Sequence, residues 1–166
     1  GFKGLGGQVL LARRLCEAGA GFVTIHYGGW DMHGRIEQAM KRNGPVVDQA
    51  VSAFLADLKD RGMDKDVLLV ITGEFGRTPR INGGAGRDHW APLSTLALAG
   101  GGLKMGQVVG ESTSKAERPK TKPISPQDLM ATVFHVLELR KNLHYTDPTV
   151  RPVPMINGGK PLAELV

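Results

Sequence analysis

The sequence predicts an α/β fold, a three-layer αβα sandwich in which helices cover a mostly parallel sheet. Apolar strand-like runs alternate with amphipathic helical segments along the chain, and this alternation is typical of α/β proteins. Residues 66–72, DVLLVIT, are apolar on both faces of the pleat, as a central parallel strand is. With 166 residues, the chain is long enough for a single domain, residues 1–166, with a core of its own.

The first half of the chain predicts two helices and a strand. Residues 8–18 repeat apolar side chains on one helical face, and Gly19 stands where a C-terminal cap would. Residues 21–27, GFVTIHY, are mostly β-branched and aromatic, which predicts a strand. Residues 45–61 predict the clearest helix, with a proline in its first turn and Gly62 at its end.

The second half continues the pattern. After residues 66–72 and a long charged loop, residues 94–100 (STLALAG) and 107–111 (QVVGE) predict two further strands. The helix predicted from Pro126 starts with Ser125 as its N-cap, and Pro126 suits the first helical position.

The composition excludes several classes of protein. No apolar run approaches the roughly 20 residues that a membrane span needs. The net charge of +5 suits an anionic substrate as well as ordinary solubility. Because the basic residues are scattered and aromatic residues make up only 5% of the chain, we expect no nucleic-acid binding. The single cysteine, Cys16, excludes an internal disulfide and any cysteine-based metal site.

Two of the predicted strands run into loops that carry carboxylates and imidazoles. Residues 21–27 lead into GGWDMHG, with Asp31 and His33 two positions apart. A carboxylate and an imidazole together can bind zinc, manganese or a similar divalent ion, with calcium or magnesium as further candidates. The alternative is that Asp31 caps the following helix and that His33 is a surface residue.

The loop after residues 66–72, GEFGRTPRINGGAGRDHW, carries the other candidates. Glu74, Asp88 and His89 are possible metal ligands. Adjacent side chains in an extended segment point opposite ways, so Asp88 and His89 would contact different ions, or one would ligate and the other support. Arg77 and Arg87 could hold an anionic group bidentately, or could pair with the carboxylates of the loop.

Four segments of the sequence resemble the C-terminal half of the DUF1501 family, which is described as a sulfatase-like member of the alkaline phosphatase superfamily. They are LLARRLCEAGAGFVTIHYGGWDMHG, VLLVITGEFGRTPRINGGAGRDHW, LALAGGGLKMGQVVGE and PISPQDLMATVFHVLEL. The resemblance implies an alkaline-phosphatase-like sandwich of which the chain is a part, with one or two divalent metals at the carboxyl edge of its sheet. It also suggests a periplasmic or secreted setting.

The resemblance can be carried over residue by residue. Asp31 and His33 match the first acid–histidine ligand pair of the superfamily, with a narrower spacing, and His89 matches its late histidine ligand. Residues 74–76 fall where the superfamily has Asp-His-Gly; Glu74 could replace the aspartate, but Phe75 cannot ligate a metal. The nucleophile of the superfamily lies upstream of the matched segments, so we expect the isolated chain to be weak or inactive as a catalyst.

The sequence therefore predicts the metal-binding portion of a metal-dependent phosphoric or sulfuric ester hydrolase. Asp31, His33, Glu74, Asp88 and His89 are the expected ligands. Arg77 and Arg87 are expected to stabilise charge on the transferring group of an anionic small-molecule or glycan ester. The first alternative is a non-catalytic descendant that binds an anion or a glycan, which the Phe75 departure favours. The second is a loop held together only by arginine–carboxylate pairs.

Overall fold

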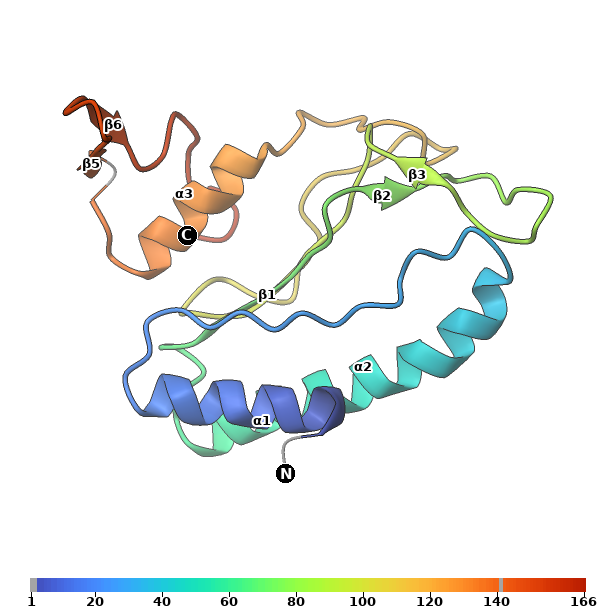
Figure 1. The fold of residues 1–166 in the computed structure, drawn as a ribbon, viewed down its shortest axis with the longest axis horizontal. Helices are drawn as coiled ribbons and strands as arrows, with labels where there is room; N and C mark the ends of the chain where they lie inside the picture. The colour runs from blue at the N-terminus through green and yellow to red at the C-terminus, as the bar shows by residue number, and fades with distance from the viewer. Residues whose placement is uncertain (1–2, 141) are drawn as a thin grey trace.

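The computed structural model describes residues 3–140 and 142–166 of the chain, a mixed α/β structure with small antiparallel sheets (Figure 1). In chain order its elements are α1 (Gly4–Glu17), α2 (Ile36–Asp60), β1 (Leu68–Ile71), β2 (Gly76–Arg77), β3 (His89–Trp90), β4 (Ala97–Gly100), α3 (Pro126–Val136), β5 (His144–Thr146) and β6 (Pro152–Pro154). No helix among the described residues is both long and apolar enough to span a membrane.

The main core lies where α1 and α2 pack together under the extended segments. Its buried members are Leu5, Val9, Ala50, Phe54 and Leu58. Half-buried side chains from the segment between the two helices and from residues 67–69, at the start of β1, pack against it: Ile25, Tyr27, Val67 and Leu69. In Figure 1, α1 and α2 lie below this segment and β1, while β2 and β3 lie beyond the far end of β1. The core thus supports the chain that leads to both loops with candidate residues.

Helix α2 begins nine residues earlier than the sequence predicts, at Ile36, and the predicted first-turn proline, Pro45, lies inside it. A proline inside a helix removes one backbone hydrogen bond but does not always end the helix. The early start is stabilised from outside, because Gly84 O accepts from Arg35 N at 3.0 Å and Ala85 O accepts from Ile36 N at 2.9 Å. The pattern around residues 36–44 could not show a cap that comes from a distant loop.

The described strands form antiparallel pairs and not the mostly parallel sheet that the sequence predicts. β1 pairs antiparallel with β4, with Leu69 opposite Ala99. Residues 21–27 are extended, with side chains that alternate in exposure, but form no strand ladder, and residues 107–111 form no strand. Hydropathy indicates that a strand is buried but not which way its neighbour runs. Here the long loop returns the chain beside β1 in the opposite direction.

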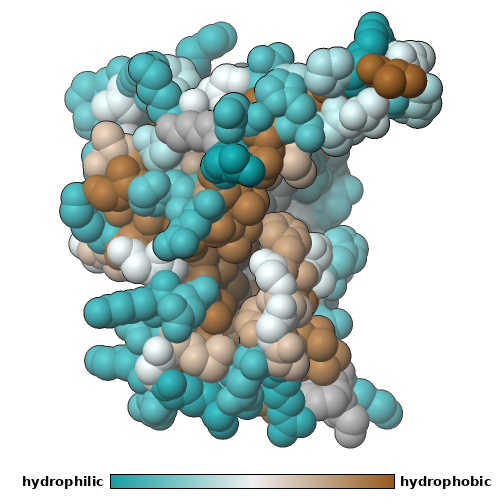
Figure 2. Space-filling model, turned by 90° about the vertical axis from the view of Figure 1, so that its left-hand side faces the viewer, coloured by the Kyte–Doolittle hydropathy of each residue, from teal (hydrophilic) through white to brown (hydrophobic). Residues whose placement is uncertain are grey.

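Helix α3 starts as predicted, with Ser125 as N-cap and Pro126 at its first position. The Ser125 hydroxyl accepts from Asp128 N, and the Asp128 carboxylate accepts from Ser125 N, which completes a capping box. The buried Thr132 hydroxyl accepts from Leu162 N at 3.0 Å and so ties the C-terminal segment to this helix. Figure 2 shows apolar side chains in a hollow on the face at which α3 lies above α1 and α2.

Candidate metal centre

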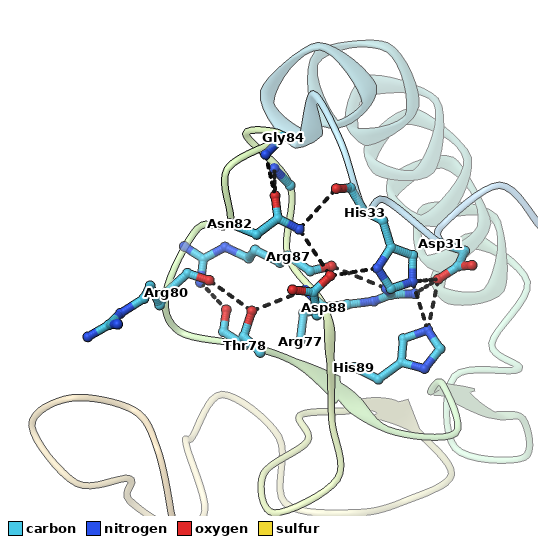
Figure 3. Close-up of polar contacts among 11 residues, drawn as sticks. Asp31, His33, Arg77, Thr78, Arg80, Asn82, Gly84, Arg87, Asp88 and His89 are labelled. Atoms are coloured by element: carbon cyan, nitrogen blue, oxygen red, sulfur yellow. Dashed lines mark hydrogen bonds and ion pairs between the residues drawn. The ribbon is translucent and has the colours of Figure 1, made fainter.

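Two stretches far apart in the sequence meet beyond the end of β1. The first is the turn of residues 30–34, which follows the extended segment. The second is the hairpin of β2 and β3, which pairs Arg77 with His89. Figure 3 shows Asp31 and His33 from the turn facing Arg77, Asp88 and His89 from the hairpin. The structure thus brings together the ends of two segments that the sequence predicts as strands, although the first of them, residues 21–27, forms no strand.

Backbone contacts hold the two stretches together. Residues 78–88, here called the site loop, connect β2 to β3. Arg87 N donates to Met32 O at 3.0 Å, and Gly34 and Ala85 form an isolated β-bridge. Gly86 is buried at the closest approach, where a side-chain carbon would lie 2.1 Å from the His33 carbonyl carbon. Only glycine allows the site loop to lie so near the turn.

Three potential ligand atoms form a nearly equilateral triangle. Asp31 Oδ1 lies 3.0 Å from His33 Nε2 and 3.0 Å from His89 Nε2, and the two nitrogens are 3.1 Å apart. Ligand atoms around a tetrahedral zinc ion, with bonds of 2.0–2.1 Å, are separated by about 3.3 Å. The triangle is therefore close to one face of a zinc coordination sphere, and small shifts would let it hold the ion.

Asp88 supports His33 from behind the triangle. Its Oδ1 lies 2.7 Å from His33 Nδ1 and 3.0 Å from Asn82 Nδ2. Because a carboxylate only accepts hydrogen bonds, this pairing places a proton on His33 Nδ1 and leaves Nε2 free to coordinate. Carboxylate–histidine–metal arrangements of this kind are common at zinc sites. Of the two roles that the sequence left open for Asp88, the geometry fits the supporting one.

Hydrogen bonds lower the pKa values of both aspartates. The pKa of Asp31 is about 2, below its usual 3.8, because His89 and then Arg77 hydrogen-bond to its carboxylate. The pKa of Asp88 is also lowered, chiefly by the hydrogen bond with His33 and then by that with Asn82. Both carboxylates therefore stay ionised to a more acidic pH than an ordinary aspartate, and ionised is the state that metal coordination requires.

Arg77 brings a fixed positive charge to the same triangle. Its Nη2 donates to Asp31 Oδ1 at 2.6 Å, and its Nη1 lies 3.5 Å from His33 Nε2. A further bond from Nη1 to Arg87 O, at 3.3 Å, fixes the guanidinium, whose side chain is only 21% exposed. The ionised Asp31 carboxylate pairs with this guanidinium and offsets its charge beside a metal ion. A guanidinium in this position could also hold an anionic group next to the metal.

Two predicted residues lie outside this arrangement. Glu74 is exposed and makes no hydrogen bond or ion pair with any described residue. Arg87 donates to the backbone carbonyls of Thr78 and Pro79, both at 2.7 Å, and so fastens the site loop. The group that could hold a metal is Asp31, His33 and His89. Glu74 and Arg87 remain predictions whose positions offer no contact with it.

Two residues contribute in ways that the sequence did not indicate. Phe75 packs its ring against His89, with ring centroids 4.4 Å apart, so it forms a wall of the site. Asn82 bonds to Asp88 and also to His33 O at 3.0 Å. An asparagine among glycines is typical of a turn, so its residue type alone does not indicate a contact with the ligand-bearing turn.

The geometry is consistent with a divalent metal held by two imidazoles and one carboxylate. All three side chains are exposed, with 67% for Asp31, 47% for His33 and 51% for His89. Three protein ligands with solvent access leave coordination positions for water or substrate, as in catalytic zinc sites and unlike closed structural ones.

Comparison with protein-family models gives a match to "Protein of unknown function (DUF1501)" over residues 3–166. The chain belongs to the DUF1501 family. This match covers every residue of the site, so the triangle, Asp88 and the site loop all lie within the DUF1501 region. Comparison with curated proteins and with solved structures gave no match.

Proposed function

We propose that the chain is the metal-binding portion of a metal-dependent hydrolase of phosphoric or sulfuric esters. The observation that carries this proposal is the triangle of Asp31, His33 and His89 with the Arg77 guanidinium against it. Two imidazoles favour zinc or manganese over calcium and magnesium, which prefer oxygen ligands.

Each residue has a distinct part in the proposed chemistry. A bound divalent ion would polarise an ester oxygen and lower the pKa of a coordinated water. Asp31, His33 and His89 would hold the ion, and Asp88 would keep His33 in its coordinating tautomer. Arg77 would bind another oxygen of the same phosphoryl or sulfuryl group and stabilise the charge that develops there. The substrate would be an anionic small-molecule or glycan ester.

The resemblance to sulfatase-like proteins of the alkaline phosphatase superfamily supports the same chemistry. On this proposal the chain is the C-terminal part of a longer sulfatase-like domain that functions in the periplasm or outside the cell. The superfamily nucleophile has no counterpart in the matched segments. Hydrolysis by this chain would therefore depend on metal-bound hydroxide and would be slow.

A second candidate function is non-catalytic binding of an anion or a glycan. The specific observation in its favour is Phe75, which stands where the superfamily has a histidine ligand and packs on His89. Because phenylalanine cannot coordinate a metal, a second metal ion would lack a protein ligand at that position. The site would then retain one metal and Arg77, which is enough to bind an anion.

The two candidates are separated by assays on the zinc-loaded chain with p-nitrophenyl phosphate, p-nitrophenyl sulfate and inorganic phosphate. The hydrolase proposal predicts slow, zinc-dependent release of p-nitrophenol that is lost in the Asp31→Ala/His89→Ala double variant. Zinc-dependent phosphate binding without any turnover would favour the anion-binding function. Zinc-loaded protein that neither binds phosphate nor hydrolyses either ester would overturn both.

A further inference from the structure

The Asn82 side chain uses its full hydrogen-bonding capacity at the rim of the site. Its Nδ2 donates to Asp88 Oδ1 and to His33 O, both at 3.0 Å. Its Oδ1 accepts from Gly84 N at 2.9 Å and from Gly86 N at 3.0 Å. An amide offers two donor hydrogens and two acceptor lone pairs, so all four are in use.

The two bonds from Asn82 Nδ2 connect the supporting carboxylate, Asp88, to His33, the residue that it supports. Asp88 Oδ1 accepts from His33 Nδ1 at 2.7 Å, and Asn82 donates to the same oxygen while also holding the His33 backbone. The His33 ring is thus fixed through its backbone and through its Nδ1 by one continuous set of bonds, as Figure 3 shows. No other described side chain hydrogen-bonds to both Asp88 and the His33 backbone.

We infer that Asn82 is a positioning residue for the metal centre, and that it acts through Asp88 to keep His33 Nε2 directed at the triangle. This inference rests on the proposed metal site. Without the Nδ2 donor, the half-exposed Asp88 carboxylate could rotate away from the ring, and His33 could exchange its tautomer. Outer partners of metal-binding histidines change metal affinity by about 10–100-fold.

The test is a zinc titration, in competition with a chelator, of the wild-type chain, Asn82→Ala, Asp88→Ala and the double variant. We expect Asn82→Ala to weaken binding about tenfold. We expect the double variant to bind no more weakly than Asp88→Ala, because Asn82 would have nothing left to act through. Thr78→Ala is the matched control, since it removes two other site-loop bonds, from Asp88 N and to Arg80 O. It should change the affinity less than about twofold.

A second readout needs no metal. Long-range nitrogen–proton NMR of the imidazole rings reports the tautomer of His33, which should carry its proton on Nδ1 in the wild-type chain and lose that preference in Asn82→Ala. If the alanine variant fails to fold, Asn82→Asp takes its place. That variant keeps the oxygen that accepts from Gly84 and Gly86 but lacks the donor, so the same loss of tautomer preference is expected.

The possible outcomes distinguish a failure of this inference from a failure of the proposed metal site on which it rests. A wild-type chain that binds no zinc overturns the proposed metal site and the inference together. A wild-type chain that binds zinc, beside an Asn82→Ala variant of equal affinity and unchanged tautomer, overturns the inference alone. Losses from Asn82→Ala and Asp88→Ala that multiply in the double variant would likewise show that Asn82 does not act through Asp88.

Discussion

Gly86 determines how closely the site loop approaches His33. A side-chain carbon at this position would lie 2.1 Å from the His33 carbonyl carbon and 2.2 Å from its oxygen, so the backbone would have to move. We expect Gly86→Ala to displace the site loop and weaken zinc binding at least about tenfold in a titration. Gly83→Ala is the control, because nothing lies within 4 Å of its added carbon. Equal zinc affinities for the two variants would contradict this account.

The sequence named the three residues of the triangle but not the roles around them. Asp31, His33 and His89 are recognisable because carboxylates and imidazoles follow two predicted strands. The supporting role of Asp88 could be predicted only as one of two alternatives, since the direction of its side chain depends on the path of β3. The sequence predicts Glu74 at the site because it comes soon after the apolar run of residues 66–72, but the chain bends there and leaves it exposed.

Helix α2 carries much of the main core through Leu58, which is 1% exposed. Replacing a buried leucine by alanine removes apolar contacts and leaves a cavity. We expect Leu58→Ala to lower the free energy of unfolding by about 2–5 kcal/mol in urea denaturation. Leu10→Ala, the same change at a residue that is 38% exposed in α1, should cost about 1 kcal/mol or less. A similar loss for both would show that the core does not depend on this packing.

The start of α3 makes stability depend on acid pH. The pKa of Asp128 is about 2, below its usual 3.8, because the Ser125 side chain and backbone and then Lys160 N hydrogen-bond to the carboxylate. A lowered folded-state pKa contributes stability that is fully present above the unfolded-state pKa and is lost as the pH falls toward 2. In urea denaturation, Asp128→Asn should be less stable than wild type at pH 7, with the difference shrinking by pH 2.5. A difference that stays constant with pH would argue against this cap.

The positions of helices and strands can be predicted from the sequence where they depend on neighbouring residues. Ser125 and Pro126 mark the start of α3 because a cap is a local feature, and β1 and β4 follow from apolar runs. The start of α2 depends instead on carbonyl groups of Gly84 and Ala85, which are nearly 50 positions away. The antiparallel pairing of β1 with β4 likewise depends on how the connecting loop folds. Information of this kind is not contained in the periodicity of a single segment.

The whole molecule exposes more surface than its size requires. Its accessible surface is 11,664 Å², whereas a compact monomer of 17.8 kDa has about 8,000 Å². Large apolar side chains such as Phe22, 75% exposed, remain accessible. A chain with so much exposed surface is expected to have a small free energy of unfolding. A ligand that binds only the folded state should therefore raise its stability measurably. Zinc at 100 times its Kd would add about 2.7 kcal/mol.

The most direct test of the metal centre is a calorimetric titration of zinc into the metal-free wild-type chain and the Asp31→Ala/His89→Ala double variant. This account predicts that the wild-type chain binds one equivalent and that the double variant, which keeps only one corner of the triangle, binds none. Circular dichroism should show that both chains are folded alike. A wild-type chain that takes up no zinc, or a double variant that binds it equally well, would contradict the account.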